Sequence, residues 1–438
     1  MAGKSERAPM KGARVDAVVV GAGPAGCAAA YTLAKAGLQV LVCERGKYAG
    51  AKNMWGGAFF GPQMAELFPD FAKEAPVERF VNRHTISLLG QEDALTFDFR
   101  TPHAPGSTHG FITLRAKFDR WMAEKVEQAG AIVATSLQAD DLVREGNFIK
   151  GVKAGPEEFP ADVVILAEGV NSLLTEKAGL RKPDSAHDMK QGVKEVIRLP
   201  REILEERFQL QGDEGAAMEF LGSCTRGLPG GGFLYTNKDS ISLGLVVQLS
   251  AVLEKRVKIS ELLEDFKKHP VIQPLIRKGE LVEYSAHLIP VSGLKMMPRL
   301  FSDGVVVVGD AAALVLGTGL ILEGANFSVA SGIAAAKAVI RAKEKGDFSQ
   351  AALQQYEKLL QDGGTLRDFE TFRRAPEFLE NERIYALYPQ WACGLARKIF
   401  TNDGKPRRNT FQVLRESMKG KVTLGNLFSD ALKARKAI

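Results

Sequence analysis

VDAVVVGAGPAGCAAAYTLAKAGLQVLVCE, residues 15–44, carries the strongest structural signal in this 438-residue chain. Its first part, 15–20, is rich in β-branched side chains and predicts a buried parallel strand. Its last part, 39–44, predicts a second buried strand, and the Ala-rich run between them predicts a helix that ends near Gly37. Three glycines separate the first strand from the helix: Gly21, Gly23 and Gly26. This order predicts a βαβ unit of a parallel sheet.

Each residue type in the glycine turn has a physical reason to accommodate a pyrophosphate. Gly21 allows the tight turn out of the strand, Gly23 lets a phosphate approach the backbone, and Gly26 lets the helix pack closely on the sheet. Pro24 and Ala25 lie within this turn, and the N-terminus of the helix that follows presents free N–H groups and the positive end of its dipole. The pattern is therefore typical of a Rossmann dinucleotide-binding fold.

The end of the second predicted strand completes this pattern. Glu44 lies eighteen residues beyond Gly26, where a carboxylate accepts hydrogen bonds from a ribose diol. Arg45 follows it and can neutralise or stack on the ligand. The fingerprint predicts a dinucleotide but does not choose between NAD and FAD.

Two distant segments favour FAD. Residues 162–167 and 304–308 predict further buried strands, and each ends in an acidic glycine turn. The turn residues are Glu168, Gly169, Gly309 and Asp310. Both turns resemble signatures of the glutathione-reductase-type FAD fold, in which the Gly-Asp carboxylate bonds to the ribityl chain. This resemblance implies that FAD is the cofactor.

The same resemblance implies further FAD-site residues. An Arg-containing turn precedes the helix near residue 118, and a long Ala-rich helix near residue 325 points its N-terminus at flavin N1 and the C2 carbonyl. A helix dipole in that place stabilises the negative charge of reduced flavin, although a plain buried helix is the alternative. The implied site residues are Asn53, Gly56, Gly57, Arg115, Gly324, Ala325 and Asn326.

Other features limit the chemistry. We find no second GxGxxG after a strand, which argues against a separate NAD(P)H domain, and no CxxxxC, which argues against a disulfide reductase. Cys27, Cys43, Cys224 and Cys393 lie far apart, so we expect no metal site and a reducing compartment. We expect flavin to carry the redox chemistry, with no side chain acting as a catalytic acid, base or nucleophile.

The predicted fold class is α/β, a glutathione-reductase-type FAD-binding Rossmann fold with an inserted mixed-sheet substrate domain and a C-terminal helical region. Residues 95–99 and 241–249 alternate polar and apolar side chains, which is typical of a sheet with one exposed face. The expected division is an FAD-binding domain of 1–80, 106–177 and 300–345, a substrate domain of 81–105 and 178–299, and a basic helical region of 346–438.

One glycine run in the substrate domain predicts a binding surface. Residues 229–237 read PGGGFLYTN, and three consecutive glycines are costly in chain entropy. We infer that something flat approaches the backbone at Gly231 and Gly232. A hairpin turn is the alternative.

The last forty-two residues are strongly basic. Residues 397–438 hold eleven Lys or Arg and three Asp or Glu, in a chain of formal net charge +6. This tail predicts contact with an anionic surface, either lipid or a partner protein, with a solvated tail as the alternative. Nothing resembles a nucleic-acid-binding module. An amphipathic helix, able to lie on a membrane or to pack on protein, is predicted from Leu424, Leu427, Phe428, Ala431 and Leu432.

Nearly the whole chain, from Val15 to about Gly420, resembles the FixC-type flavoproteins, relatives of the electron-transfer-flavoprotein:quinone oxidoreductases. The segments that carry this resemblance are ERGKY at 44–48, GGFLY at 231–235, HP at 269–270, LKMMP at 294–298, NERIY at 381–385 and FTNDGKP at 400–406.

The resemblance implies electron transfer from an electron-transfer flavoprotein, through FAD, to a membrane quinone, with Gly231 and Gly232 contacting the quinone head group. It also implies a subunit of an NADH-oxidising electron-bifurcating complex, with two electron-transfer flavoprotein subunits and a separate ferredoxin-like iron–sulfur subunit. The expected location is cytoplasmic, with peripheral contact on the inner face of the cell membrane, because no signal peptide or membrane-spanning helix is predicted.

Three other functions share this FAD architecture. A geranylgeranyl (prenyl-lipid) reductase would need a long apolar tunnel, and a single-component flavin monooxygenase would use transient NADPH. An assembly subunit with a structural flavin is the non-enzymatic alternative. The segment from Gly231 to Tyr235 favours the quinone family over the first two.

Overall fold

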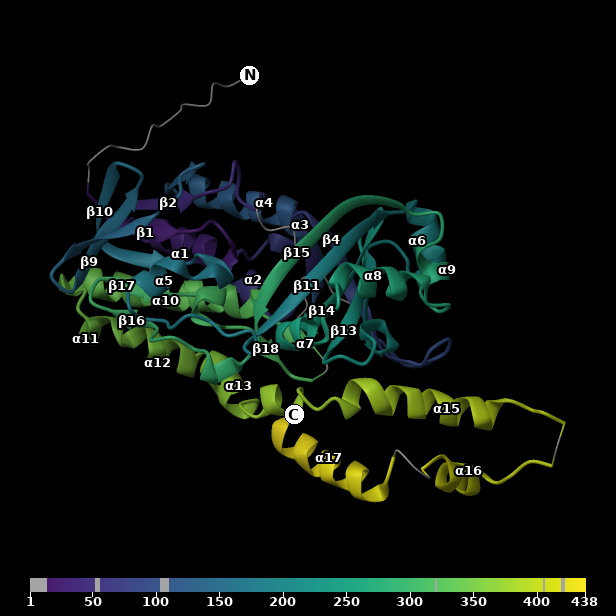
Figure 1. Cartoon of the computed structure of the whole chain (residues 1–438). Helices are drawn as coiled ribbons and strands as arrows, with labels where there is room; N and C mark the ends of the chain where they lie inside the picture. Colours follow the sequence, from purple (N-terminus) through teal and green to yellow (C-terminus); the bar gives the residue numbers. More distant parts are fainter. Residues whose placement is uncertain (1–13, 52–55, 103–109, 320, 405, 419–421) are drawn as a thin grey trace.

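The computed structural model describes residues 14–51, 56–102, 110–319, 321–404, 406–418 and 422–438. Two large sheets lie side by side, and a line of C-terminal helices runs beneath them (Figure 1). The chain passes between the sheets several times, so that residues distant in sequence meet where the sheets face each other. The predicted α/β fold class is confirmed.

The first sheet has eight strands and contains the predicted nucleotide unit. Its path is β16-β17-β10-β1-β2-β7, and β9 adds to β10 with β8 beside it. The strands from β17 to β7 run parallel, and those at its centre are buried apolar runs, as expected for a parallel sheet covered on both faces. The bounds are β1 Val15–Val20, β2 Val40–Glu44, β7 Ile132–Thr135, β8 Asp141–Glu145, β9 Phe148–Ala154, β10 Glu157–Leu166, β16 Phe301–Ser302 and β17 Val305–Val307.

Two Ala-rich helices, α1 (Pro24–Lys35) and α10 (Ala325–Lys345), pack closely against one another beside this sheet (Figure 1). Small residues make this approach possible: a Cβ on Gly332 would lie 2.2 Å from the carbonyl oxygen of Ala25. The N-termini of both helices consequently reach the same cavity. The other helices around this sheet include α2 Gln63–Leu67, α3 Phe71–Glu74, α4 Arg115–Gln128 and α5 Leu173–Lys177.

The second sheet has nine strands in the order β15-β11-β14-β13-β12-β4-β6-β3, with β5 on β4. One face packs under α8, whose Leu262, Leu263 and Phe266 are buried there, and the other face turns toward the nucleotide unit. The strand bounds are β3 Gly56–Phe59, β4 Val77–Leu89, β5 Ala94–Arg100, β6 Phe111–Leu114, β11 Met189–Arg198, β12 Glu214–Gly222, β13 Gly230–Thr236, β14 Ser240–Gln248 and β15 Glu280–Pro290.

Short elements connect these strands and border the space between the sheets. The helices are α6 Arg201–Phe208, α7 Leu249–Lys255, α8 Ile259–Lys268 and α9 Gln273–Ile276. The single turns are η1 Gly169–Asn171, η2 Ser223–Thr225, η3 Gly293–Lys295 and η4 Gly309–Ala312. A small hairpin is formed by β18 Leu316–Gly317 and β19 Leu322–Glu323.

The strand pairing differs from the expected division of the chain in one respect. β3 and β6, which that division gives to the FAD-binding domain, hydrogen-bond to each other and to β4 in the second sheet. Short strands such as these have no preference of their own for either sheet, because their pairing is decided by distant partners.

The C-terminal region is helical, as predicted. Its elements are α11 Gln350–Leu353, α12 Gln355–Asp362, α13 Thr365–Thr371, α14 Ala375–Phe378, the π-helical turn η5 Arg383–Leu387, α15 Tyr388–Phe400, α16 Thr410–Ser417 and α17 Leu424–Ala437. α15, α16 and α17 form an arm below the second sheet (Figure 1). Among the described helices, none is long and apolar enough to cross a membrane.

Candidate functional site

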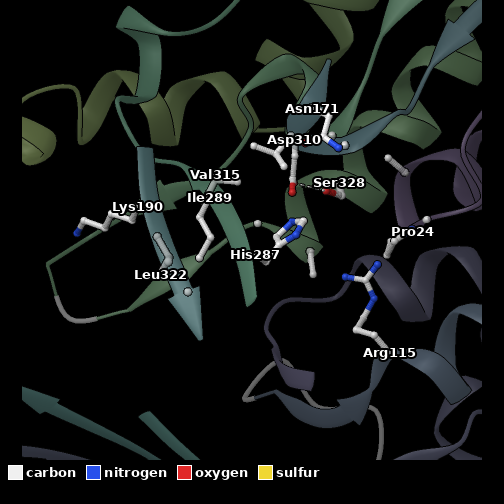
Figure 2. A pocket seen from close by; sticks show the side chains of 18 of the residues that line it. Pro24, Arg115, Asn171, Lys190, His287, Ile289, Asp310, Val315, Leu322 and Ser328 are labelled. Carbon is white, nitrogen blue, oxygen red and sulfur yellow. Dashed lines mark hydrogen bonds between the residues drawn. The ribbon is translucent and has the colours of Figure 1, made fainter. Parts of the chain in front are cut away.

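A cavity of about 630 Å³ lies where the nucleotide unit faces the second sheet. This volume falls within the usual range for ligand sites. One wall comes from the ends of β1, β2, β10 and β17 with the starts of α1 and α10, and the other from β11, β12, β13 and β15. Figure 2 shows His287 of the second sheet between Asp310 and Arg115 of the nucleotide unit, with Lys190 pointing the other way.

The turn before α1 is a backbone cradle with no room for side chains. Gly21 has a positive φ of 101°, and a Cβ on it would lie 2.4 Å from the carbonyl oxygen of Ala167. A Cβ on Gly26 would lie 1.9 Å from the carbonyl oxygen of Gly21. Gly23 is the N-cap and no side chain caps the helix, so the first-turn N–H groups of α1 are open to a phosphate beside Pro24 and Ala25.

Glu44 is held rigidly at the end of β2. Its Oε2 accepts a hydrogen bond from the backbone N–H of Ala22 at 3.0 Å, and its Oε1 accepts one from Gly46 at 2.6 Å. The carboxylate lines the cavity beside the exposed side chain of Arg45. These contacts fix an acceptor where the ribose hydroxyls of a dinucleotide would lie.

Glu168 lines the cavity, as Glu44 does, but its hydrogen bonds go to a different element. Its carboxylate accepts hydrogen bonds from the N–H of Leu174 at 2.8 Å and from both the N–H and the hydroxyl of Thr175 at 2.7 Å. It therefore stabilises the start of α5. The backbone here, including Gly169 with its positive φ of 72°, forms the edge of the cavity.

Asp310 lies in the η4 turn with its carboxylate toward the cavity (Figure 2). Ser328 donates to its Oδ1 at 3.5 Å. Gly309 has a φ of 65°, and a Cβ there would lie 2.9 Å from that of Ala25, so this turn also depends on glycine. Arg181, which the sequence did not single out, donates to the carbonyl oxygen of Ala311 at 2.9 Å and supports the turn from behind.

Arg115 begins α4 and points into the cavity (Figure 2). Burial disfavours its charge, but Asp119 accepts hydrogen bonds from Nε at 2.6 Å and from Nη2 at 2.8 Å. The charge and hydrogen bonds of Asp119 outweigh the burial and raise the pKa of Arg115 above its ordinary value. The site therefore contains a permanent cation.

The start of α10 brings a second uncapped helix end to the cavity. Gly324 is the N-cap without a side-chain cap, and Gly324, Ala325 and Ser328 line the cavity. Asn326 is buried and its amide donates to Oε2 of Glu323 at 2.7 Å. Asn326 is not among the lining residues. Its side chain instead holds Glu323 of β19, just before the helix.

The remaining FAD-site predictions fall elsewhere. Gly56 and Gly57 pair with β6 in the second sheet and are not among the lining residues, and Asn53 lies outside the described residues. Gly50, which the sequence reasoning missed, does line the cavity. Its φ is 90°, and a Cβ on it would lie 2.9 Å from the carbonyl oxygen of Arg115. A glycine in a turn just after the second strand was the available signal.

The predicted glycine pair lies on β13, and its two members use opposite faces. A Cβ on Gly232 would lie 2.8 Å from the ring of Phe266 in the core beneath α8, and one on Gly231 would lie 3.3 Å from the side chain of Leu221, which lines the cavity. The backbones of both glycines border the cavity. The glycine run is a strand here and not the hairpin turn that was the alternative.

Ionisable groups of the second sheet also line the cavity, and the sequence reasoning missed them. Burial raises the pKa of Glu219 to about 8 and lowers that of Lys190 to about 8. Burial also lowers the pKa of His287, against the opposing charge of Asp310. A lone acid in the apolar run AAMEFLG was the only sequence signal for Glu219.

The residues present fit FAD. Glycines leave room for a pyrophosphate at α1, Glu44 offers an acceptor, and two uncapped helix starts meet in one cavity. Among the described residues there is no group of three His, Cys, Asp or Glu that could hold a metal ion. A Rossmann sheet joined in this way to a mixed sheet defines an FAD-dependent oxidoreductase, and FAD supplies the electron-transfer chemistry.

Comparisons with known proteins identify the family. The model of the ETF-QO/FixC family C-terminal domain matches residues 375–438, and that of the FAD dependent oxidoreductases matches 16–104. The probable electron transfer flavoprotein-quinone oxidoreductase YdiS of Escherichia coli strain K12 is 46% identical over 97% of this chain and 99% of its own. Protein FixC of the same strain is 44% identical over 95% and 97%. The chain belongs to the ETF-QO/FixC family.

A solved structure adds support for the fold. A geranylgeranyl bacteriochlorophyll reductase-like protein from Thermoplasma acidophilum matches with a TM-score of 0.73 and 21% identity, over 96% of this chain and 99% of its own. At that identity the likeness concerns the architecture alone. The predicted flavoprotein oxidoreductase with FAD as its cofactor is confirmed by the family membership.

Proposed function

We propose that this chain receives electrons from an electron-transfer flavoprotein on its FAD and passes them to a membrane quinone. The observation that carries the proposal is the two-walled cavity. One wall has the glycine cradle and helix ends suited to a dinucleotide, and the other has a strand face opened by Gly231. The name of the relative YdiS, a probable electron transfer flavoprotein-quinone oxidoreductase, gives this second wall its proposed ligand.

The proposal divides the cavity between the two ligands. The pyrophosphate and ribose of FAD lie along the glycine cradle and Glu44, and the flavin reaches the start of α10, whose dipole stabilises negative charge. Arg115 and Asp310 lie on either side of His287 in this cavity (Figure 2). The proposed FAD-binding residues that line the cavity are Gly21, Gly23, Pro24, Ala25, Glu44, Arg45, Arg115, Glu168, Gly169, Gly309, Asp310, Gly324 and Ala325.

In the proposal the quinone ring lies against β13. Gly231 has no side chain, and its neighbour across the sheet, Val246 of β14, is only partly buried and lines the same cavity. A flat ring can therefore approach the backbone between Leu221 and Val246. Phe233, the next residue of β13 on this face, supplies an apolar flank.

The electron source and the assembly are also part of the proposal. Two electron-transfer flavoprotein subunits deliver electrons, and the complex as a whole oxidises NADH by electron bifurcation. The iron–sulfur centre belongs to a separate ferredoxin-like subunit. The four cysteines of this chain are buried apart from one another, and burial raises the pKa of both Cys43 and Cys224 to about 12, which suits apolar packing.

The exposed face of α17 supports a peripheral location on the inner face of the cell membrane. Leu424 is 75% exposed and Phe428 is 69% exposed, so much of the apolar stripe of this helix is open to solvent. Lys433, Arg435 and Lys436 follow in the last turns. Apolar side chains beside basic ones suit the surface of an anionic membrane.

A cavity-filling variant tests the quinone site. Val246→Phe adds bulk at the wall beside Gly231, and we expect quinone reduction by the FAD-loaded, photoreduced protein to fall at least tenfold, an effect of about 1.4 kcal/mol, with FAD content unchanged. Leu253→Phe, on the exposed face of α7, is the matched control and should match wild type. Gly231 is a less clean target, because a Cβ there would also lie 2.8 Å from the carbonyl oxygen of Phe220.

The same experiment can overturn the proposal. If reduced wild-type protein passes no electrons to a short-chain quinone, or accepts none from an electron-transfer flavoprotein, the function is wrong. If Val246→Phe reduces quinone as fast as wild type, the quinone lies elsewhere. Rapid bleaching of the flavin by NADPH in the presence of oxygen would instead favour a self-contained monooxygenase or prenyl-lipid reductase.

A further inference from the structure

Glu219 lies on the face of β12 that borders the cavity, near the part of β13 where Gly231 has no side chain. In the antiparallel pairing of β12 with β13, Glu219 lies directly opposite Phe233. Gly231 is therefore its diagonal neighbour on the same face, and such neighbours have Cα atoms roughly 7–8 Å apart. Both residues line the cavity. A carboxyl side chain can thus reach a molecule that lies against Gly231.

The surroundings of this carboxyl are apolar. On the same face, Leu221 lies two residues along β12, Phe233 lies opposite on β13, and Ile86 of β4 lies beside it on the other flank. Among the described residues, none donates a hydrogen bond to the carboxyl of Glu219 or forms an ion pair with it, and burial alone accounts for its shifted pKa. Burial raises its pKa to about 8, so the group is a neutral acid at pH 7.

The other ionisable groups near Glu219 are paired, more distant or hold their proton more tightly. Tyr235 lies two residues along β13, and burial with the charge of Glu219 raises its pKa above the ordinary value. On β4, His84 lies two residues before Ile86, the residue paired with Glu219. Beyond β14, Lys194 is paired with Glu283 at 2.9 Å, and His287 lies on the outer strand β15.

The π-helical turn η5 also packs on β12. Its Tyr385 lines the cavity, but its hydroxyl donates to the carbonyl oxygen of Leu379 at 2.8 Å. Arg383 of the same turn is bound to Asp430 at 2.6 Å. Lys190 of the same wall also has a pKa of about 8, but it lies on β11, with β14 between it and β13, and its side chain points away from His287 (Figure 2). Within the described part of the chain, Glu219 is therefore the acid with a proton to give that lies beside Gly231.

We propose that Glu219 is the proton donor to the quinone, a role that rests on the proposed function. Conversion of a quinone into its quinol takes two electrons and two protons. Reduced FAD, bound as proposed above, would supply the electrons. The O–H bond of the Glu219 carboxyl breaks and a new O–H bond forms at one quinone oxygen, and water supplies the second proton and then reprotonates Glu219. This assigns an acid role where the sequence predicted none.

A spectroscopic test needs no turnover. Infrared spectra of the FAD-loaded protein should contain the C=O band of a protonated carboxyl at pH 6, and the band should disappear with a midpoint near pH 8. Glu219→Gln should lack the band. Glu206→Gln, at an exposed acid of α6, is the matched control and should keep it. A band that is missing in wild type, or still present in Glu219→Gln, would overturn the proposal.

Kinetics give the second readout. Quinone reduction by the pre-reduced protein should slow in wild type as the pH rises above about 8. Glu219→Gln should be slower by about 100-fold, the usual effect of losing a general acid, and should show no such pH dependence. Glu219→Asp keeps an acid and should fall in between. Ferrocenium accepts an electron without a proton, so its reduction should be equal in all these proteins.

The two proposals fail in different ways. Wild-type protein that reduces ferrocenium but no quinone removes the proposed function, and the role of Glu219 with it. Wild-type protein that reduces quinone, with Glu219→Gln equally fast, removes only the role of Glu219. If Glu219→Gln does not retain FAD, Glu219→Asp decides: a wild-type rate at pH 7 together with an unshifted pH profile contradicts proton donation.

Discussion

Arg115 and Asp119 face each other across one turn of α4 and are joined by two hydrogen bonds, Nε to Oδ1 at 2.6 Å and Nη2 to Oδ2 at 2.8 Å. The side chain of Asp119 is fully buried, and that of Arg115 is 12% exposed, toward the cavity. Asp119 thereby fixes the direction in which a permanent cation is presented to the ligand.

The first prediction concerns this pair. Asp119→Ala leaves the buried guanidinium without its partner and should lower the free energy of unfolding by about 3–5 kcal/mol, measured by urea unfolding of the FAD-free protein. Arg115→Lys keeps the charge but loses the two-point geometry, and should raise the dissociation constant of FAD about tenfold. Arg120→Lys, at an exposed position of the same helix, is the control. Equal FAD affinity in all three proteins would remove Arg115 from the site.

The second prediction compares two helical glycines. A Cβ on Gly332 would lie 2.2 Å from the carbonyl oxygen of Ala25, at the start of α1. Gly332→Ala should therefore push α1 from α10, destabilise the protein by about 1–3 kcal/mol, and weaken FAD binding. Gly394 in α15 has no atom within 4 Å of an added Cβ, so Gly394→Ala should stabilise by about 0.5–1 kcal/mol. Thermal unfolding that shifts both variants in the same direction would contradict close packing as the reason for Gly332.

Local signals explain how much of the fold the sequence could predict. The strand–turn–helix–strand unit of residues 15–44 was predictable because its periodicity, its glycines and its helix end all lie within one short segment. The amphipathic helix near the C-terminus was predicted for the same reason, and it forms as α17. Its packing was not predictable, because the apolar stripe is exposed and the buried side includes the polar Asp430.

The site was less predictable where it depends on pairing between distant strands. Glu219 reaches the cavity because β12 pairs in parallel with β4 and antiparallel with β13, which no local pattern encodes. Gly56 and Gly57 look like part of the nucleotide unit by position, yet their strand joins the second sheet. Glu44 and Glu168 follow similar strands, but their hydrogen-bond partners differ. Glu44 accepts a hydrogen bond from Ala22 beside the glycine turn, whereas Glu168 accepts one from Leu174 at the start of α5.

The third prediction separates the two members of the glycine pair. Gly232→Ala places a Cβ 2.8 Å from the ring of Phe266, so it should overpack the core and cost about 1–3 kcal/mol of stability. Adding Phe266→Leu makes room, and the double variant should be more stable than the sum of the single effects by about 1 kcal/mol. Strict additivity in urea unfolding would show that Gly232 does not face this core.

The fourth prediction concerns the docking of α17. Asp430 accepts hydrogen bonds from Nε and Nη2 of Arg383 at 2.7 and 2.6 Å and a further bond from the hydroxyl of Tyr388. The Arg383 hydrogen bonds hold the pKa of Asp430 well below its ordinary value. Its stabilising effect is therefore complete above the unfolded pKa of about 4 and is lost as the pH falls further.

Asp430→Asn should accordingly speed amide hydrogen exchange in residues 424–437 at pH 7 by about tenfold, and the difference from wild type should shrink below pH about 4. Asp362→Asn, at an exposed position at the end of α12, should leave this exchange unchanged. Faster exchange in both variants would indicate a general effect of charge and not the loss of the Arg383 contact.

The fifth prediction has the opposite dependence on pH. Burial raises the pKa of Glu219 to about 8, whereas an unfolded glutamate has a pKa of about 4.3. Between these values the native protein keeps a proton that the unfolded chain has lost, so Glu219 makes the fold less stable as the pH rises through this window. Glu219→Gln has no proton to lose. Its stability relative to wild type should grow from pH 5 to pH 9 by about 4 kcal/mol, measured by urea unfolding of the FAD-free protein.

The two acid variants check each other in the same buffers. Asp430 is stabilised as an anion, so its contribution to folding stability is lost at acid pH. Glu219 is stabilised as a neutral acid, so it destabilises the fold at alkaline pH. A stability difference for Glu219→Gln that does not change with pH would mean that the carboxyl is already ionised at pH 5 in the folded protein. Glu219 would then have no proton to give at neutral pH, and proton donation to the quinone would fail on thermodynamic grounds alone.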